Sequence, residues 1–395
     1  MNRHNRYVAV CLLVAFVGVS TQAADESDQQ PSRRQQLLKR FDKDGDGKLS
    51  DSEREAVRQA LGRFRRNESE PTPKPTVDPE TTDLYKLAKG PLAIAAIETL
   101  VLHDDQRNKD LQLRVTYPKA DGKYPIIVFS HGASGSKDGY QPLVSYWASH
   151  GYVCIQPTHG DSLSLLSRDE RRQFPSLNDY VNSGTALKHW RSRPEDIRLV
   201  LDSLDKIQEE SPQLKGKLDE QRIGMGGHSF GAHTTQMIGG LSLKSPLARQ
   251  RTVIADERPR ALLMISPQGT GASIDKESWS GIERPTMVIT GTKDTSRTGK
   301  PYTWRLEVFE NLPPGEKYLA FIEGAHHSFG GIAGVRYPGS GPEIADHVYY
   351  VKTSSLAFWD AYLKGDQSAT SFLDSGKMKE ATNGIAHIRK RPSER

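Results

Sequence analysis

The stretch from residue 222 to residue 238 constrains the fold more than any other part of the sequence. A short apolar run at 223–226 leads into Gly-His-Ser-Phe-Gly at 227–231, and a helical pattern follows at 231–238. A serine at a sharp turn between strand and helix exposes its hydroxyl, and flanking glycines let the backbone pass without clashes. The pentapeptide alone is weak, because a glycine-rich turn can hold a passive serine. The strand before it and the helix after it favour Ser229 as a nucleophile.

Short apolar runs alternate with amphipathic stretches from about residue 84 onward. Strands are predicted at 94–101, 111–117, 124–130, 152–156, 223–226, 261–265, 286–290 and 317–322, with helices at 194–207 and 231–238. This alternation predicts an α/β fold, a mostly parallel sheet flanked by helices. The first two strands follow each other without a helix between them, so the sheet is expected to begin antiparallel.

The acid and the base of a serine nucleophile in such a fold follow it in chain order. Asp294 comes just after the predicted strand 286–290 and is the candidate acid; an aspartate that only caps this turn is the alternative. The loop after strand 317–322 carries two adjacent histidines, His326 and His327, and either can fold back over the serine. Their spacing alone does not choose between them.

The oxyanion formed during acyl transfer needs two backbone donors. One is the amide of Phe230, directly after the nucleophile, and the other lies in a loop that follows an earlier strand. The loop 130–135, Ser-His-Gly-Ala-Ser-Gly, follows strand 124–130, and we assign the second donor to Ala133. His131 in this loop is a candidate for fixing the loop, with a catalytic role as the alternative.

Four segments together resemble a known superfamily: 128–132, 157–162, 193–197 and 222–232. They resemble the α/β-hydrolase superfamily, and more narrowly the esterases similar to dienelactone hydrolase and platelet-activating-factor acetylhydrolase, with cutinase-type enzymes as cousins. The resemblance implies cleavage of small or polymeric carboxylic esters through an acyl-enzyme, with no cofactor in the active site. Related turns place the base at the second histidine, here His327. Dienelactone hydrolases carry cysteine where this chain has Ser229.

A second motif lies near the amino terminus, in a predicted EF-hand segment at 33–66. Residues 42–53 fit a calcium-binding loop: carboxylates alternate, glycine makes the bend at 47, and a glutamate closes the loop. The predicted calcium ligands are Asp42, Asp44, Asp46, the carbonyl of Lys48, and Glu53. Helices are expected at 35–41 and 52–64. An acidic turn that caps a helix is the alternative. The role of a calcium-bound segment stays open: it can pair with the same segment of a second chain, dock onto the catalytic domain, stabilise its own small domain or sense calcium.

The remaining segments suggest export. Residues 1–23 combine a basic start, an apolar run and small residues before Ala23, which predicts a cleaved signal peptide and a periplasmic or secreted protein. An uncleaved anchor is the alternative. Residues 67–83 predict an extended, mobile, proline-rich linker, and residues 84–395 the catalytic domain. Cleavage leaves Cys154, expected in a buried strand, without a cysteine partner for a disulfide.

Charge and motif content leave two rival functions beside ester hydrolysis. The net charge is +5, but the basic residues gather near the ends and do not interleave with aromatic residues, so nucleic-acid binding is not expected. One rival is a peptidase or amidase on the same fold. The other is a calcium-dependent binding protein whose hydrolase domain is inert. The oligomeric state stays open.

Overall fold

The structure is a computed structural model. It describes residues 42, 44, 46–50, 52–53, 76–79, 82–174, 179–180, 183, 186–245, 250–334 and 341–392. The chain divides into two compact units, residues 1–71 and 72–395. The predicted signal peptide, residues 1–23, lies outside the described residues, as does most of the predicted EF-hand segment.

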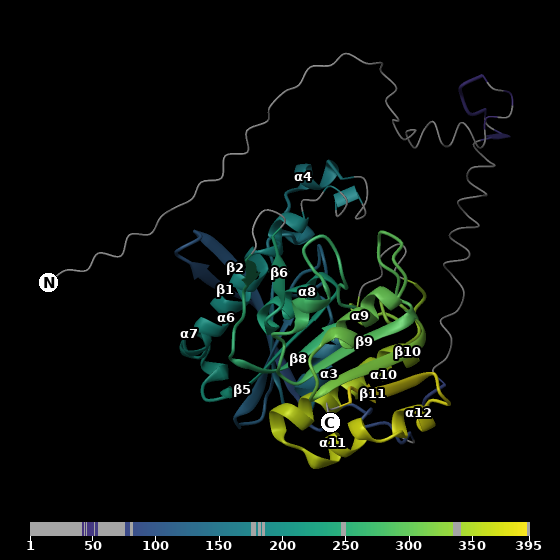
Figure 1. Cartoon of the computed structure of the whole chain (residues 1–395). Helices are drawn as coiled ribbons and strands as arrows, with labels where there is room; N and C mark the ends of the chain where they lie inside the picture. Colours follow the sequence, from purple (N-terminus) through teal and green to yellow (C-terminus); the bar gives the residue numbers. More distant parts are fainter. Residues whose placement is uncertain are drawn as a thin grey trace. The chain divides into compact units, whose positions relative to one another are not determined.

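A mixed sheet forms the centre of the second unit (Figure 1). Its strands in chain order are β1 (Ile94–Asp104), β2 (Lys109–Pro118), β3 (Tyr124–Ser130), β4 (Val153–Pro157), β5 (Leu218–His228), β8 (Pro259–Ile265), β9 (Thr286–Lys293), β10 (Lys317–His326) and β11 (Ala386–Lys390). Their spatial order is β1-β2-β4-β3-β5-β8-β9-β10-β11. The strands from β4 to β10 are parallel, whereas β1, β2 and β11 join by antiparallel pairs. The expected antiparallel start is confirmed.

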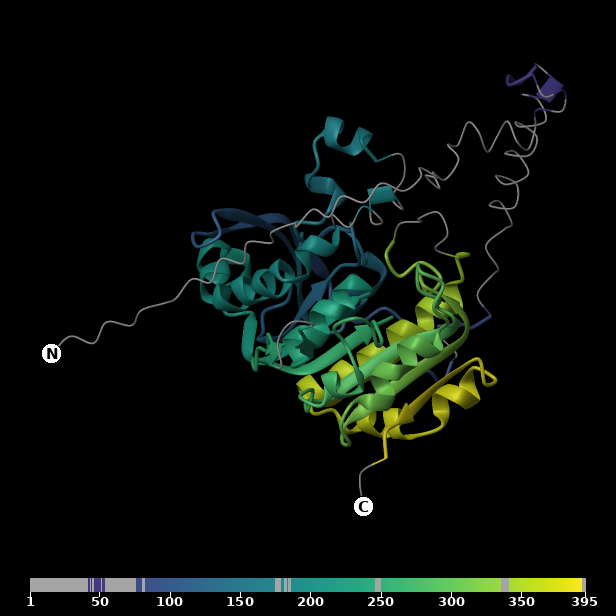
Figure 2. The same cartoon turned by 45° about the horizontal axis from the view of Figure 1, so that its top comes forward.

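Helices cover both faces of the sheet (Figure 1 and Figure 2). They are α3 (Gln141–Ser149), α4 (Arg168–Arg172), α6 (Ser192–Asp202), α7 (Leu204–Glu210), α8 (Phe230–Gly239), α9 (Thr303–Asn311), α10 (Ala345–Trp359), α11 (Gln367–Asp374) and α12 (Lys377–Ala381). Shorter helical turns are η1 (Leu163–Leu165), η2 (Ala186–Trp190), η3 (Pro212–Leu214), η4 (Lys276–Trp279) and η5 (Asp360–Lys364), and β6 (Ser242–Lys244) pairs with β7 (Arg251–Val253). None of the helices within the described residues is both long and apolar enough to cross a bilayer.

The two hydrophobic cores follow from the alternation of side chains along the strands. In β3, Ile126 and Val128 pack with α6, α7 and α8, whereas Ile127 and Phe129 pack with α3 and α10. Strands β8 and β9 divide their apolar residues in the same way. Apolar residues at successive positions are what a parallel strand buried on both faces requires. The α/β-hydrolase fold expected from the sequence is confirmed.

Some elements differ from the sequence prediction. The helix predicted at 194–207 is two helices, α6 and α7, because Ser203 has φ −110° and ψ 12° and interrupts the helical backbone. Strand β11 and the small β6–β7 pair were not predicted, since both are short and carry charged or polar residues at alternate positions. Cys154 is buried in β4, as expected.

Part of the predicted linker is attached to the catalytic unit. The Thr76 amide donates to the Asp346 carboxylate at 3.0 Å, next to the start of α10, and its hydroxyl donates to the same group. Val77 packs against the core that includes α10. The chain is therefore anchored at 76–77, inside the stretch 67–83 that we predict to be an extended, mobile linker.

Candidate functional site

Ser229 lies at a tight turn between β5 and α8, and its backbone is strained. It has φ 55° and ψ −117°, a conformation that non-glycine residues rarely adopt. The two flanking glycines are required by space. A Cβ at Gly227 would lie 2.3 Å from the Gly231 carbonyl oxygen, and one at Gly231 would lie 1.9 Å from that of Ser130. The close approach of Gly231 to Ser130 brings the loop after β3 against the turn.

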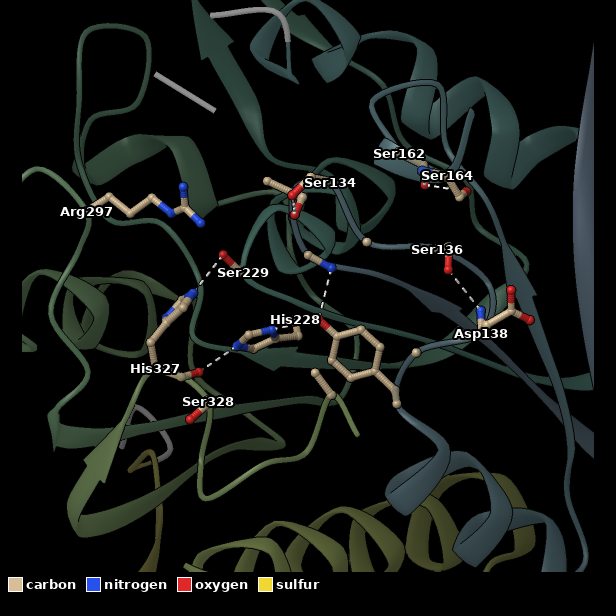
Figure 3. A pocket seen from close by; sticks show the side chains of 16 residues that line it. Ser134, Ser136, Asp138, Ser162, Ser164, His228, Ser229, Arg297, His327 and Ser328 are labelled. Carbon is tan, nitrogen blue, oxygen red and sulfur yellow. Dashed lines mark hydrogen bonds between the residues drawn. The ribbon is translucent and has the colours of Figure 1, made fainter. Parts of the chain in front are cut away.

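The structure brings the predicted nucleophile, base and acid together. His327 Nε2 lies 3.0 Å from Ser229 Oγ (Figure 3). On its other side, His327 Nδ1 lies 2.8 Å from Asp294 Oδ1. The three residues directly follow the carboxyl ends of β5, β9 and β10. Strands β9 and β10 are neighbours in the sheet, and β8 lies between β5 and β9. His326 ends β10 and makes none of these contacts. The geometry therefore selects His327 from the two adjacent histidines.

Asp294 is fully buried and is held as a carboxylate. Arg305 Nε lies 2.9 Å from Asp294 Oδ1, Ser266 Oγ donates to the same oxygen at 2.9 Å, and Thr290 Oγ1 donates to the other oxygen at 3.0 Å. Burial opposes ionisation, but the Arg305 charge, the His327 hydrogen bond and the Ser266 hydroxyl outweigh it and lower the pKa of Asp294 to about 2. Asp294 is therefore ionised at neutral pH.

The ionised Asp294 determines the tautomer of His327. A carboxylate only accepts hydrogen bonds, so Nδ1 of His327 carries the proton and Nε2 is free to accept the Ser229 O–H. Burial lowers the pKa of His327, Asp294 opposes that effect, and Arg305 and Arg297 add to it. The imidazole is consequently neutral near pH 7, and its side chain is still 29% exposed on the pocket side. These are the properties of a general base.

The two amides predicted as oxyanion donors flank Ser229. The Phe230 amide begins α8, where helix N–H groups lack intrahelical acceptors. The Ala133 amide lies in the loop after β3 and lines the same pocket as Ser229. Neither amide has a hydrogen-bond acceptor among the described residues. Both are therefore available to a developing negative charge near Ser229.

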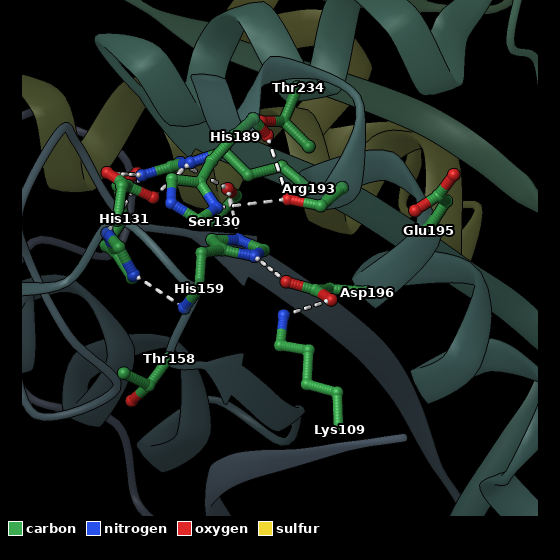
Figure 4. A network of polar contacts seen from close by, with 12 residues as sticks. Lys109, Ser130, His131, Thr158, His159, His189, Arg193, Glu195, Asp196 and Thr234 are labelled. Carbon is green, nitrogen blue, oxygen red and sulfur yellow. Dashed lines mark hydrogen bonds and ion pairs between the residues drawn. The ribbon is translucent and has the colours of Figure 1, made fainter. Parts of the chain in front are cut away.

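A buried arginine, Arg193, binds the backbone on the amino-terminal side of Ala133; Figure 4 shows it in the same polar network as Ser130 and His131. Arg193, at the start of α6, pairs with Asp161 through Nε and Nη2, each at 2.8 Å. Its Nη1 donates to the His131 carbonyl at 2.7 Å and its Nη2 to the Gly132 carbonyl at 3.2 Å. Asp161 in turn accepts the Ser134 amide at 2.9 Å. The residues on both sides of Ala133 are thus bound by one ion pair.

The same arginine also contacts the second oxyanion residue. Its guanidinium carbon lies 4.3 Å from the centre of the Phe230 ring. Both Arg193 and Asp161 are fully buried. Burial opposes ionisation of Asp161, yet the Arg193 charge keeps its pKa well below the usual range. A charge pair at this depth is stable only when its hydrogen bonds are satisfied, and here they are satisfied mainly by the loop.

The side chains of three other histidines near the site contact the surrounding loops and helices and not the Ser229 hydroxyl. His131 Nδ1 donates to the Gly132 carbonyl at 2.6 Å and its Nε2 accepts the His159 amide at 3.0 Å. His159 bridges Ser130 Oγ at 2.8 Å and Asp196 at 2.9 Å (Figure 4). Burial, with the nearby Arg193 charge, lowers the pKa of His131 well below its usual value and that of His159 to about 4. His233 stacks on the Phe230 ring at 6.1 Å.

His228, the residue before the nucleophile, connects the two halves of the site. Its Nε2–H donates to the His327 carbonyl at 2.8 Å, and its Nδ1 accepts the Tyr140 hydroxyl at 2.8 Å. The Gly132 amide donates to the Tyr140 oxygen at 3.0 Å. Burial lowers the pKa of His228 to about 3, so the ring stays neutral and keeps this pattern of donors. A continuous chain of hydrogen bonds therefore runs from the loop after β3 to the backbone of the base.

A pocket of about 230 Å³ opens over Ser229. The loop around Ala133 forms one wall, and Ser162 and Ser164 add hydroxyl groups beyond it (Figure 3). Ser162 is the N-cap of η1, and Ser164 lies within that turn. Arg297, between β9 and α9, lies on the other side of Ser229.

The sequence predicted the nucleophile, base, acid and oxyanion donors that the structure brings together, but not the residues that support them. Arg305, Ser266 and Tyr140 received no role. Asp161 and Arg193 lie within the segments that carry the superfamily resemblance, yet no role was assigned to either. That placement was the one available signal, because an aspartate and an arginine 32 residues apart reveal their pairing only after folding.

Known proteins resemble this chain over the same region. A family model described as Chlorophyllase matches residues 80–247, which include the Ala133 loop, Arg193 and Ser229 but end before Asp294 and His327. The platelet-activating factor acetylhydrolase of Cavia porcellus is 25% identical over 63% of this chain and 60% of its own length. Cutinase 2 of Thermobifida cellulosilytica is 23% identical over 66% of this chain and 77% of its own.

A further relative covers less of the chain. A Schizosaccharomyces pombe protein with the provisional name phospholipase A2 is 28% identical over 33% of this chain and 38% of its own length. The chain thus spans less than two thirds of the acetylhydrolase and of this protein. The three relatives are thus named as a phospholipase, an acetylhydrolase and a cutinase, and each is at most 28% identical to this chain.

The described part of the predicted calcium loop has a compact acidic geometry. One carboxylate oxygen from each of Asp42, Asp44 and Asp46 lies within 4.8 Å of the others. Gly47 has φ 76°, and its amide donates to Asp42 at 2.9 Å. Glu53, at the end of the loop, accepts the Ser50 amide at 2.9 Å. The expected helices 35–41 and 52–64 lie outside the described residues except for Ser52 and Glu53.

Proposed function

We propose that the protein is a serine hydrolase that cleaves carboxylic esters through an acyl-enzyme intermediate. The observation that carries this proposal is the contact of His327 Nε2 with Ser229 Oγ at 3.0 Å while His327 Nδ1 lies 2.8 Å from an ionised Asp294. A nucleophile, a neutral base and an oriented acid within hydrogen-bond reach are what this chemistry needs. The ester-hydrolase names of the relatives support the choice of reaction.

The first half-reaction forms the acyl-enzyme. Ser229 Oγ attacks the ester carbonyl carbon while His327 Nε2 takes the hydroxyl proton. The carbonyl oxygen becomes an oxyanion between the amides of Ala133 and Phe230. The tetrahedral intermediate then collapses, and His327 delivers the proton to the departing alkoxide, which leaves as the alcohol. Asp294 remains ionised and stabilises the imidazolium.

The second half-reaction repeats these steps with water. His327 removes a proton from a water molecule that attacks the acyl carbon, and the same two amides hold the second oxyanion. Collapse releases the carboxylic acid and returns the proton to Ser229. Every step uses groups of this chain and water.

The amidase alternative differs in the leaving group. The nitrogen of an amide leaves only after the imidazolium has protonated it, because an unprotonated nitrogen would leave as an anion far more basic than an alkoxide. We expect nitrophenyl esters to react, and the matching nitroanilides to react at least about 10³-fold more slowly, as the ester-hydrolase names of the relatives favour. Comparable rates on both would replace this proposal by the amidase alternative.

Ser229→Ala tests the proposal. Turnover of a short-chain nitrophenyl ester should fall by about 10⁴-fold or more, because the covalent route is lost, while the circular dichroism spectrum is unchanged. His326→Gln is the matched control, since it removes an adjacent histidine that does not contact Ser229, and its rate should stay within about twofold of wild type. Near-normal turnover by Ser229→Ala would refute the assignment.

Residues 42–53 support a second proposal, calcium binding. We infer that Asp42, Asp44, Asp46, the Lys48 carbonyl and Glu53 hold one Ca²⁺, because hard oxygen ligands with this spacing fit its coordination shell. The amide of Asp46 lowers the pKa of Asp44, but the surrounding carboxylates outweigh it and raise that pKa, which a divalent cation would reverse. The ion would order this loop, and no step of ester hydrolysis passes through it.

Calorimetry on the full chain tests calcium binding. Wild type should bind one Ca²⁺, and Asp42→Ala or Glu53→Ala should weaken the affinity by roughly tenfold or more, because each removes a negative ligand. Asp121→Ala is the control, since this exposed aspartate lies far along the chain in the catalytic unit. Absence of binding by wild type would end the proposal.

Export is proposed from residues 1–23. We infer that the signal peptide is removed after Ala23 and that the enzyme acts in the periplasm or outside the cell. Amino-terminal sequencing of protein recovered from an exporting host should begin at Ala24. A retained Met1 in a membrane-bound product would favour an uncleaved anchor.

A further inference from the structure

Arg297 is a charged residue at the pocket that the proposed reaction does not use. It lies between β9 and α9 and lines the pocket together with Ser229 and His327. Its guanidinium points toward Ser229 (Figure 3). Its positive charge is close enough to His327 to contribute to the lowered pKa of that imidazole, after the larger effects of burial and Asp294.

Within the part of the chain that the structure describes, no carboxylate balances the charge of Arg297. The described pocket lining contains one carboxyl group, that of Asp138, which is already paired with Lys137 Nζ at 2.8 Å and Arg114 Nη1 at 3.5 Å. Among the described residues, Arg297 has neither an ion pair nor a side-chain hydrogen bond. Neighbouring protein partly shields it from water and lowers its pKa, and no carboxylate opposes that effect. The pocket therefore has an excess of positive charge beside the nucleophile.

An unbalanced guanidinium in this position favours a negatively charged ligand. Arginine presents a rigid fork of N–H donors that matches both oxygens of a carboxylate, and charge-assisted hydrogen bonds of this kind are stronger than neutral ones. A cleft of one sign also raises the local concentration of ligands of the opposite sign. The proposed hydrolysis consumes one ester and one water, so such a carboxylate would pass unchanged into the product.

We propose that the preferred substrates are esters that carry a carboxylate near the scissile bond, and that Arg297 binds this carboxylate. The inference rests on the proposed ester hydrolysis and adds the substrate class. The carboxylate can belong to the acyl group, as in a half-ester of a dicarboxylic acid, or to the alcohol. Both have the same chemistry at Arg297, and two pairs of esters distinguish them.

The experiment compares charged and neutral esters of equal length. For the acyl side, the pair is mono-4-nitrophenyl adipate and 4-nitrophenyl hexanoate; for the alcohol side, it is 3-acetoxybenzoate and 3-acetoxybenzamide. At about pH 8, where His327 is neutral with or without the Arg297 charge, Arg297→Gln should lower kcat/KM for the charged ester of at least one pair by about tenfold and change that for the neutral ester by less than about twofold. Arg297→Lys should keep part of the preference, because it retains the charge but loses the fork.

Arg260→Gln is the matched control. Arg260 is an exposed arginine at the start of β8, at the end of that strand opposite Ser266, and its loss changes the net charge equally. In both ester pairs, Arg260→Gln should leave the ratio of kcat/KM for the charged ester to kcat/KM for the neutral ester unchanged. Raising the salt concentration should lower the wild-type ratio of kcat/KM for the charged ester to kcat/KM for the neutral ester, because salt screens an interaction between accessible charges. The same ratio for Arg297→Gln should not change.

The outcomes separate this inference from the proposed function. If wild type cleaves the neutral esters but Arg297→Gln lowers charged and neutral esters equally, or alters neither, the carboxylate inference is wrong and ester hydrolysis stands. If wild type cleaves none of the four esters, ester hydrolysis and the inference that rests on it both fail. A selective loss in one pair supports the inference and assigns the carboxylate to the acyl or the alcohol side.

Discussion

Two buried arginines support opposite sides of the proposed active site, and each does so in a similar way. On the base side, Arg305 pairs with Asp294 and donates to the carbonyls of Ser266 and Pro267, at 3.0 and 2.9 Å. On the oxyanion side, Arg193 pairs with Asp161 and donates to the carbonyls of His131 and Gly132. In both cases an ion pair binds the backbone of a loop that follows a strand.

The two arginines differ in what their carboxylate partner touches. Asp294 contacts the imidazole of His327, so Arg305 affects the charges that take part in proton transfer. Asp161 contacts the Ser134 amide, so Arg193 acts on the position of the Ala133 amide and not on the base His327. A buried arginine–carboxylate pair thus sets the charges around His327 on one side of the site and the position of the Ala133 amide on the other. Substitutions on the two sides should therefore fail in different ways.

Asp294→Asn should give the largest loss on the base side. An asparagine can donate to Nδ1 and so stabilise the tautomer whose proton sits on Nε2, where the Ser229 proton must go. We expect kcat to fall by about 10⁴-fold at neutral pH. Steady-state kinetics on a nitrophenyl ester measure this effect, with circular dichroism to confirm the fold. A loss of less than about tenfold would mean that Asp294 only caps its turn.

Arg193→Lys should give the next largest loss and should act through the oxyanion. Lysine keeps a positive charge near Asp161 but cannot hold both loop carbonyls, so the Ala133 amide moves. We expect kcat to fall by about 10²-fold with KM changed little, because losing one oxyanion donor costs about 10²–10³. The pH at which activity is half-maximal on the acid side should not move. A shift of that midpoint would place Arg193 in the electrostatics of the base instead.

Arg305→Gln should produce the smaller effect, a shift in the pH profile. Activity requires neutral His327, so the acid limb of kcat/KM follows the pKa of this group, which burial and the nearby arginines hold below its ordinary value of about 6.5. Removing the Arg305 charge raises that pKa, and the acid limb should move to higher pH.

Arg305→Lys keeps the charge and is the control for Arg305→Gln; its acid limb should stay near that of wild type. The comparison is read on protein that remains folded, because an unpaired Asp294 costs roughly 3–5 kcal/mol of stability. If the limb of Arg305→Gln does not move, or if Arg193→Lys moves it as far, the proposed division of labour between the two arginines is wrong.

The parts predictable from sequence are those with local signals. The parallel strands could be predicted because their apolar residues run together, and Ser229 because strand, glycine turn and helix are contiguous. Asp294 could be named because it follows a strand whose place in the chain order is diagnostic, and the same argument limits the base to His326 or His327 without choosing between them. Arg193 and Arg305 could not be assigned roles, since each is a single charge in a helix and its carboxylate partner is on another segment. His326 and His327 differ only in the direction of their side chains, which requires the folded loop.

Covalent labelling with a fluorophosphonate tests the central claim most directly. The probe reacts only with a serine whose hydroxyl is activated by a base and whose oxyanion is stabilised, so it reports the assembled site without assuming a substrate. Mass spectrometry of digested protein should find one phosphonylated residue, Ser229, with labelling abolished in Ser229→Ala and slowed strongly in Asp294→Asn. Absence of labelling in folded wild type, or a label on another serine, would contradict the account.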